Sequence, residues 1–327
     1  MVHVIPSDIA PLLQQAAALR SQGRLERAEA LARAALQRAP GDPAASHVLA
    51  TVLLTGGDYA RGLPHFEARH TVFNRRMPAL PYPEWRGEPV RQLLVWPEQG
   101  YGDQIQMARF ASVLAERSSV SWVTPTPLTR LFRESLPVEI VEVAQSITFP
   151  DPDAWVMSFG LPLRLDVRTP DELPSEPYLR PPEAVRDRWA GYARGDFKIG
   201  VAWRGNPDHR NDANRSLASR DALAPIAAYG TIHDLTDPLG DFADTAAIVE
   251  QLDLVVTVDT ALAHLAGAMG KPCWVLLPAF EVDWRWMTGR DDSPWYPSIR
   301  LFRQRTSGDW RSVTEQVTAE LGRHAGR

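Results

Sequence analysis

The segment from residue 252 to residue 278 constrains the fold of this chain more than any other. It runs LDLVVTVDTALAHLAGAMGKPCWVLLP, with an apolar run at each end and an Ala- and Leu-rich stretch between them. Short continuous apolar runs are typical of parallel strands buried on both faces. Asp259 or Thr260 caps a helix after the first run, and Gly270 with Pro272 ends it. The segment therefore predicts a strand, a helix and a second strand of a parallel α/β sheet.

The same alternation fills most of the chain from Val90 onward. RQLLVWPE and VSWVTP are predicted strands on either side of the helix DQIQMARFASVLAER. After a Pro-rich connection and a helix near 183–194, the strand FKIGVAW opens the block that continues through 252–278. We therefore expect two Rossmann-like doubly wound lobes, at residues 90–182 and 183–308, and a C-terminal helix within 309–327.

Residues 1–73 carry an internal repeat instead. Small residues recur 34 positions later, as Ala16 and Ala50 or Gly23 and Gly57 illustrate. This period resembles that of tetratricopeptide repeats, in which helix pairs bury a shared face on their neighbours. Four helices are expected, near 8–22, 24–38, 43–56 and 58–72. The Pro- and Arg-rich residues 74–89 are predicted to be a linker to the first lobe.

Composition excludes several classes of protein. The net charge of −5 disfavours a nucleic-acid-binding protein, which needs a basic surface. Cys273 is the one cysteine, so no intrachain disulfide forms and a reducing compartment is expected. The sequence has neither a secretory signal pattern at its start nor a membrane-spanning apolar run. We therefore expect a cytoplasmic protein.

The first candidate site follows the predicted strand LDLVVTV. Ligands of open α/β sheets bind beyond the carboxyl ends of strands, where a helix N-terminus favours phosphate. Asp259 is placed to meet a ribose hydroxyl, and Thr260 with the amides of Ala261 and Leu262 to hold phosphate. His264 lies one turn further on the same helix face. The alternative is an ordinary capped junction with a core histidine.

A second candidate is the stretch VWPEQGYGDQIQMARF, residues 95–110. A strand runs into a Gly-containing loop, and Asp103 opens the next helix. There its carboxylate is placed to take a proton from an acceptor hydroxyl. Asp at a helix start is equally a common cap, so both roles remain open. No Gly-Lys-Ser/Thr follows, so the loop is not a P-loop.

Basic and aromatic side chains supply the remaining candidates. Arg204 and Asn206 lie in the loop after FKIGVAW, and an Arg there can hold a pyrophosphate through its planar fork of donors, although basic loops are commonly just solvated. Five polar or aromatic residues are candidates for a wall that faces a sugar or an acceptor: Gln99, Tyr101, Gln104, Trp284 and Arg285. For Trp284 the alternative is packing in the core.

No metal site is expected. The eight histidines are scattered, and the sequence has no His-Glu-x-x-His and no Cys pair. Asp151-Pro152-Asp153 is similar to an acidic pair that can hold a metal ion, but its Pro-rich surroundings favour a surface turn.

Four segments together resemble bacterial tetratricopeptide-repeat glycosyltransferases: GYGDQIQMARF, VAWRGNPDHRND, DFADTAAIVEQLDLVVTVDTALAHLAGAMGKP and DWRWMTGRDDSPWYPSIRLFRQ. The catalytic part is similar to the heptosyltransferases of lipopolysaccharide synthesis and, distantly, to O-GlcNAc transferase. The resemblance implies a GT-B fold with two Rossmann-like lobes. It also implies Asp103 as catalytic base and Asp259–His264 as the element that holds the donor nucleotide, with Arg204 and Asn206 at donor-phosphate positions.

The resemblance implies inverting, metal-independent transfer from a nucleotide sugar to a protein or glycan hydroxyl. No cofactor is expected beyond this co-substrate, and the repeats are candidates for acceptor recruitment. Two departures stand out: the chain has only two repeat units, and TIHDLTD lacks the Ser-Leu-Gln segment expected at that strand end. A catalytically degenerate scaffold and a GT-B-fold nucleotide-sugar epimerase are the alternative functions.

Overall fold

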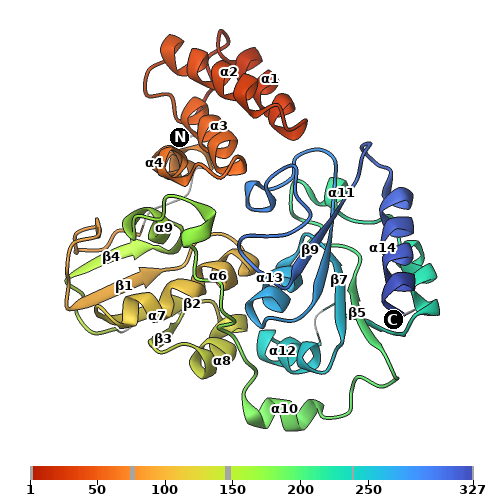
Figure 1. Cartoon of the computed structure of the whole chain (residues 1–327). Coiled ribbons are helices and arrows are strands. Elements are labelled where there is room, and N and C mark those ends of the chain that lie inside the picture. Colours follow the sequence, from red (N-terminus) through yellow and green to blue (C-terminus); the bar gives the residue numbers. More distant parts are fainter. Residues whose placement is uncertain (1–2, 74–77, 144–148, 238, 326–327) are drawn as a thin grey trace. The chain divides into compact units, whose positions relative to one another are not determined.

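The computed structural model describes residues 3–73, 78–143, 149–237 and 239–325. The chain divides into two compact units, and Figure 1 labels their elements. Unit 1 contains residues 1–81, 162–173 and 279–295, whereas unit 2 contains 82–161, 174–278 and 296–327. Two segments from within the predicted lobes are therefore part of the same unit as the N-terminal helices.

Unit 1 is mainly helical. Its repeat helices are α1 (Ala10–Ser21), α2 (Leu25–Arg38), α3 (Pro43–Thr55), α4 (Tyr59–Phe66) and α5 (Arg69–Val72). The later segments add most of α9 (Leu161–Arg164) and the 3-10 turns η3 (Pro170–Glu172) and η5 (Trp284–Trp286). Alanines such as Ala16 and Ala32 are fully buried where the helices meet, and small side chains of this kind let two helices approach closely. The four predicted repeat helices are confirmed, with the last one divided at Glu67 and Ala68.

The segment 279–295 completes the core of unit 1. The ring of Trp284 lies edge-on to Tyr59 at 5.9 Å and to Phe66 at 5.6 Å. Trp295 is 6.1 Å from Tyr59 and 5.8 Å from Trp284. Arg20 of α1 donates to the carbonyl oxygen of Val282 at 3.1 Å. The second repeat thus buries its aromatic side chains against residues from the far end of the chain.

Unit 2 contains two parallel sheets. The first has the strand order β3-β2-β1-β4, formed by β1 (Gln92–Trp96), β2 (Ser119–Thr124), β3 (Glu139–Glu142) and β4 (Ala154–Met157). The second has the order β6-β5-β7-β8-β9, formed by β5 (Lys198–Ala202), β6 (Thr231–Asp234), β7 (Leu254–Val258), β8 (Cys273–Leu277) and β9 (Ile299–Arg303). Both orders are doubly wound, so the predicted pair of Rossmann-like sheets is confirmed.

The helices of unit 2 connect and cover these strands. After β1 come α6 (Tyr101–Met107), η1 (Ala108–Phe110) and α7 (Ala111–Ala115). The other elements around the first sheet are α8 (Thr126–Ser135) and η2 (Ser158–Gly160), and α10 (Glu183–Trp189) leads to the second. The second sheet is accompanied by α11 (Asp212–Arg215), η4 (Arg220–Ala228), α12 (Phe242–Glu250), α13 (Ala261–Ala268) and α14 (Trp310–Ala325).

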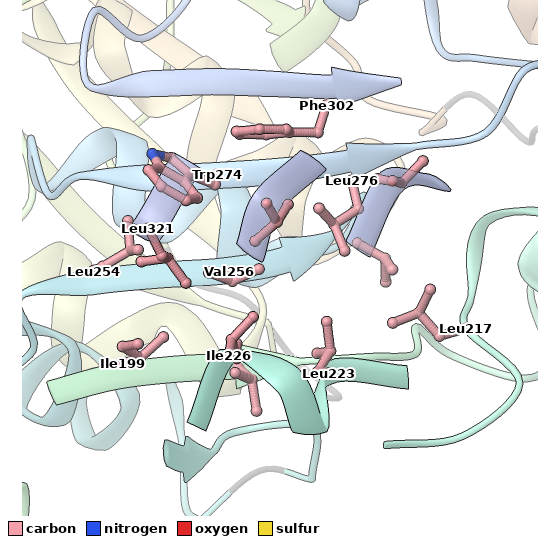
Figure 2. Packing of buried hydrophobic residues seen from close by; sticks show 14 residues of the cluster. Ile199, Leu217, Leu223, Ile226, Leu254, Val256, Trp274, Leu276, Phe302 and Leu321 are labelled. Atoms are coloured by element: carbon pink, nitrogen blue, oxygen red, sulfur yellow. The ribbon is translucent and has the colours of Figure 1, made fainter. Parts of the chain in front are cut away.

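One face of the second sheet packs on η4 and α14. Alternate residues of β7, Leu254, Val256 and Val258, belong to this core, because side chains on a strand alternate between its two faces. Figure 2 shows Leu254 and Val256 beside Trp274 and Phe302, with Ile226 of η4 and Leu321 of α14 nearby. The intervening Val255 and Thr257 are also fully buried. This two-sided burial explains the continuous apolar run LDLVVTV.

Ion pairs connect the helices of the two sheets. Arg130 of α8 makes bidentate contact with Asp241, at 2.6 and 2.7 Å, just before α12 begins. It also reaches Asp244 at 2.8 Å, which accepts a further hydrogen bond from the indole of Trp189. Because the side chain of Asp244 is only 6% exposed, these partners are needed to offset its desolvation.

Part of the predicted linker is ordered against the first sheet. Glu84 bridges to Trp155 of β4, and the amide of Trp85 donates to the carbonyl of Trp155 at 2.7 Å. Residues 74–77 of that linker lie outside the described residues. The predicted helix near 183–194 ends at Trp189, and the C-terminal helix runs from Trp310 to Ala325.

Candidate functional site

Three loops of unit 2 follow strands at the points where the strand order reverses. In the first sheet the chain leaves β1 for β2 on one side, and β4 then pairs on the other side of β1. In the second sheet β5 has β6 on one side and β7 on the other. Crevices at such switch points are where open α/β sheets bind ligands. The loops after β1, β5 and β7 contain the three candidate segments identified in the sequence.

Asp103 lies in the first turn of α6. Its Oδ2 accepts a hydrogen bond from the backbone amide of Gly100 at 2.8 Å, so the side chain stabilises the start of the helix. The residue is partly exposed, whereas the next residues of α6 are buried. A carboxylate that contacts solvent can still accept a proton from a ligand hydroxyl. The cap therefore exists, and the predicted role of Asp103 as a base stays a prediction.

The first turns of α6 and α13 are in close contact. A Cβ atom placed on Gly102 would lie 2.8 Å from Cδ2 of His264 and 3.2 Å from Cα of Ala261. Only a glycine permits this approach without a shift of one helix. Asp103 is consequently adjacent in the chain to a residue that touches the first turn of α13. The structure thus brings together the two strongest candidate segments of the sequence.

Thr260 is the N-cap of α13. Its Oγ1 accepts a hydrogen bond from the amide of Leu262 at 3.3 Å and is 3.1 Å from Oγ1 of Thr257. Asp259 and Ala261 are partly exposed beside it. A phosphate at this helix start would meet the positive end of the helix dipole, and the Leu262 amide would exchange the Thr260 oxygen for a phosphate oxygen.

His264 is 6% exposed and belongs to a buried polar cluster. Its Nδ1 is 3.0 Å from the hydroxyl of Tyr296. The guanidinium of Arg109 lies over the rings of Tyr296, at 4.7 Å, and Tyr178, at 5.4 Å. Burial raises the pKa of both phenols, so both hydroxyls keep their protons. The spacing of residues in the sequence does not indicate that His264 has these partners.

The loop after β5 is rich in charge. Arg204 forms an ion pair with Asp237 at 2.6 Å, and its guanidinium lies 5.3 Å from the ring centre of Trp203. Asn206 is exposed, and its side-chain oxygen accepts from the amide of Asp208 at 3.0 Å. To contact a donor phosphate, Arg204 would have to share its guanidinium with Asp237.

His209 of the same loop lies within electrostatic range of Asp103. Burial, followed by the charges of Arg215 and Arg210, lowers the pKa of the His209 imidazole, while the Asp103 carboxylate acts in the opposite direction. His209 Nδ1 is 3.2 Å from the amide of Asn211, from which it accepts a hydrogen bond. The loop after β5 therefore lies near the start of α6.

The predicted sugar-facing wall is divided between the units. Three of its residues lie in unit 2. Gln99 has a positive φ of 67°, and Tyr101 is 44% exposed, with its ring centre 5.4 Å from that of Phe242. Gln104 is buried and donates a hydrogen bond to the carbonyl of Glu98. Trp284 and Arg285 are buried in unit 1. For Trp284 this burial favours core packing, and the wall as a whole stays a prediction.

Within the described ranges, no three His, Cys, Asp or Glu residues are grouped so as to hold a metal ion. Asp153 instead accepts hydrogen bonds from the amides of Arg91 and Gln92, and Asp151 accepts one from the hydroxyl of Tyr82. Both carboxylates thus stabilise loops at the amino-terminal edge of the first sheet.

Similarity to known protein families agrees with this geometry. Residues 9–52 match the tetratricopeptide repeat, and residues 235–276, which contain β7 and α13, match glycosyltransferase family 9 (heptosyltransferase). The chain thus contains one segment similar to tetratricopeptide repeats and another similar to glycosyltransferase family 9. The family 9 match includes Asp259, Thr260 and His264 and ends before Tyr296.

Similar proteins extend the comparison beyond the family 9 match. Protein FlbA of Caulobacter vibrioides is 25% identical over 91% of this chain, which spans 59% of the length of FlbA. A family 9 glycosyl transferase from Veillonella parvula superposes with a TM-score of 0.50 at 11% identity, covering 73% of this chain and 98% of that one. E. coli ADP-heptose lipopolysaccharide heptosyltransferase II gives a TM-score of 0.43 at 12% identity, with coverage of 72% and 99%. At this identity, the likeness to the Veillonella structure shows similarity of fold alone.

Sequence reasoning singled out none of three residues that the structure places around α13: Arg109, Tyr178 and Tyr296. Tyr296 had one available signal, because it lies within the Trp-rich stretch 283–298. No helix of the described ranges has both the length and the hydropathy needed to cross a membrane.

Proposed function

We propose that this protein is an inverting, metal-independent glycosyltransferase that moves a sugar from a nucleotide sugar to a hydroxyl of a protein or glycan. One observation carries the proposal: the start of α6, with Asp103, packs on the first turn of α13 through Gly102. A carboxylate and a phosphate-binding helix start are thereby brought to one place. The match of this helix to glycosyltransferase family 9 supports the choice of substrate class.

The reaction we propose is a single displacement. Asp103 accepts the proton of the acceptor hydroxyl, and the hydroxyl oxygen forms a bond to the anomeric carbon of the sugar. The bond between this carbon and the phosphate oxygen breaks, and the nucleoside diphosphate leaves with the bonding electrons. The amides at the start of α13 and the guanidinium of Arg204 stabilise its charge, because fixed donors are effective where charge develops. This role of fixed donors is why the proposal includes no divalent ion.

Ligand-dependent stability tests the donor site. Nucleotide sugars carrying ADP, UDP, GDP, dTDP or CMP are added separately while the melting temperature of the full chain is measured. A ligand at a hundredfold excess over its dissociation constant stabilises the native state by about 2.7 kcal/mol. If none of the five shifts the melting temperature at millimolar concentration, the donor site is assigned wrongly. A stabilisation that disappears in the Thr260→Val variant supports the assignment of the donor site to the start of α13.

Product analysis with the stabilising donor then tests the reaction. Transfer to an added acceptor supports the proposal, whereas conversion of the donor sugar without any acceptor would indicate an epimerase. Binding without turnover would indicate a scaffold.

We also propose that the N-terminal helices recruit the acceptor. Charge reversal at the exposed positions Glu26 and Arg27 should then raise the KM for acceptor and leave donor affinity unchanged.

A further inference from the structure

Residues 174–179 belong to unit 2 and follow the segment 162–173 of unit 1 directly. Tyr178, within this stretch, contacts both helices of the candidate site with different groups. Its backbone amide donates to the carbonyl of Ala268, the last residue of α13, at 2.9 Å. Its side-chain hydroxyl donates to the carbonyl of Ile105 in α6, also at 2.9 Å. One residue therefore connects the helix that carries Asp103 with the proposed donor-binding helix.

The connection to α13 consists of main-chain hydrogen bonds. The last carbonyl groups of an α-helix have no partner within the helix. The carbonyl of Ala268 accepts from the amides of Tyr178 and Leu179, at 2.9 and 3.1 Å. Directly after the helix, a Cβ atom on Gly270 would lie 2.6 Å from Cγ of Pro177, so the two segments are closely packed there. A change in the side chain of Tyr178 leaves these amide hydrogen bonds in place.

The connection to α6 depends on side chains instead. The guanidinium of Arg109, in the turn η1 that follows α6, lies 5.4 Å from the ring centre of Tyr178. Arg109 is 2% exposed, and it donates to the carbonyl of Gln106 at 3.0 Å and to that of Pro174 at 2.8 Å. Buried hydrogen bonds of this kind are costly to lose. A movement of α6 along residues 174–179 would therefore break favourable contacts.

The position of Asp103 needs this second connection between the helices. The direct contact is made through Gly102, which lets α6 approach the first turn of α13 but has no side chain to interlock with it. The hydroxyl of Tyr178 holds α6 at Ile105, three residues and about 4.5 Å further along the helix axis. Asp103 lies between these two points. With both of them held, α6 cannot turn about Gly102 without losing a hydrogen bond.

We propose that Tyr178 is a positioning residue, which fixes the Asp103 carboxylate relative to the start of α13. It acts through α6 and touches neither substrate. The inference rests on the proposed function, because it requires Asp103 to be the base. A displacement of about 1 Å in a reacting group can cost about a hundredfold in rate. A hydrogen bond one helical turn away from the base therefore affects turnover.

Replacing Tyr178 with Phe removes the hydroxyl and keeps the ring and the main-chain hydrogen bonds. Turnover with saturating donor should fall about tenfold and the donor dissociation constant should change less than about twofold, because one buried hydrogen bond that holds only α6 is lost. Tyr82→Phe is the matched control and should change neither quantity, since its hydroxyl donates to Asp151 at the amino-terminal edge of the first sheet. Normal turnover in Tyr178→Phe would overturn the proposal, as would a larger effect on donor affinity than on turnover.

A double-mutant cycle distinguishes positioning from a general weakening of the fold. If Tyr178 acts through the Asp103 carboxylate, Tyr178→Phe should not slow turnover further in an Asp103→Asn background, which already lacks the base. Single-turnover measurements at high enzyme concentration give the slow rates of these variants. An equal fold-loss from Tyr178→Phe in both backgrounds would show that Tyr178 acts independently of Asp103, and the proposal would be wrong.

Hydrogen exchange of the full chain without ligand tests the connection separately from the function. Tyr178→Phe should speed exchange of the amides in α6 and leave those of α12 and of unit 1 unchanged, because only α6 loses a hydrogen bond. Equal exchange of α6 in the variant and in wild type would refute the role of the hydroxyl. If no nucleotide sugar is turned over, the proposed function fails, whereas the exchange of α6 still decides whether Tyr178 holds this helix.

Discussion

Replacing Asp103 with Asn separates the two roles of this side chain. The carboxylate accepts from the amide of Gly100 at 2.8 Å, and the side-chain oxygen of Asn can keep this hydrogen bond. Asn and Asp cap helices about equally well, so the free energy of unfolding should change by less than about 0.5 kcal/mol. For a chain of this size that corresponds to a melting temperature within about 2 °C of wild type.

The effect on turnover should be far larger if Asp103 is the base. An amide cannot take the proton of the acceptor hydroxyl, and general-base catalysis contributes about a hundred- to ten-thousandfold in rate. This loss raises the activation barrier by about 2.7–5.5 kcal/mol. Donor affinity should stay near that of wild type, because the substitution leaves α13, the proposed nucleotide-binding helix, unchanged. The assay is steady-state transfer with the stabilising donor, alongside donor affinity from the same protein.

Two further variants make the result interpretable. Asp103→Ala removes both the base and the cap, so it should show the same loss of turnover and an additional destabilisation of about 1 kcal/mol. Asp309→Asn changes another aspartate that accepts from a helix amide, that of Ser312, and should be silent in both assays. Near-normal turnover in Asp103→Asn would reduce Asp103 to a cap and refute the mechanism.

Three more predictions follow from the site and the core. Gly102→Ala should lower both the melting temperature and the donor affinity, because the added Cβ would lie 2.8 Å from His264. Gly100→Ala is the control and should change neither quantity, because its Cβ would meet only the Asp103 carboxylate, at 3.3 Å. Equal donor affinities in the two variants would disprove the contact between Gly102 and His264. Cys273 is buried, and burial raises the pKa of its thiol, so thiol reagents should label it only as fast as unit 2 opens. The stabilising donor should slow this labelling, whereas rapid labelling of the native protein would refute the burial of Cys273. Transfer should persist in excess EDTA, and a loss of activity that magnesium or manganese restores would show that a metal is required.

The sequence predicted those parts of the fold that local patterns specify. The apolar run at 252–258 predicted a buried strand because both of its faces are covered, and the 34-residue repeat predicted a helix near 43–56, which the structure contains as α3. Strands β3 and β4 were not predicted, since each has only four residues and too few for a clear period.

The site was predicted only as far as strand ends and helix starts define it. Asp103, Thr260 and His264 lie where the strand–helix junctions placed them. Tyr296 and Arg109 could not be found in this way, because their role arises from contacts between elements distant in sequence. The Trp284 side chain shows the same limit: nothing local indicates that its ring packs on Tyr59 of the second repeat.

The aromatic core of unit 1 also has a consequence for how the chain folds during synthesis. Tyr59 and Phe66 leave the ribosome early, but Trp284 and Trp295, which cover them, are translated near the end. At about 5–20 residues per second, the second repeat waits roughly ten seconds or longer for its partners. During this interval its aromatic face is open to water, chaperones and other nascent chains. A shortened chain that ends before Trp284 keeps that face exposed permanently, so the repeat helices cannot be separated from the rest of the protein as an independent module.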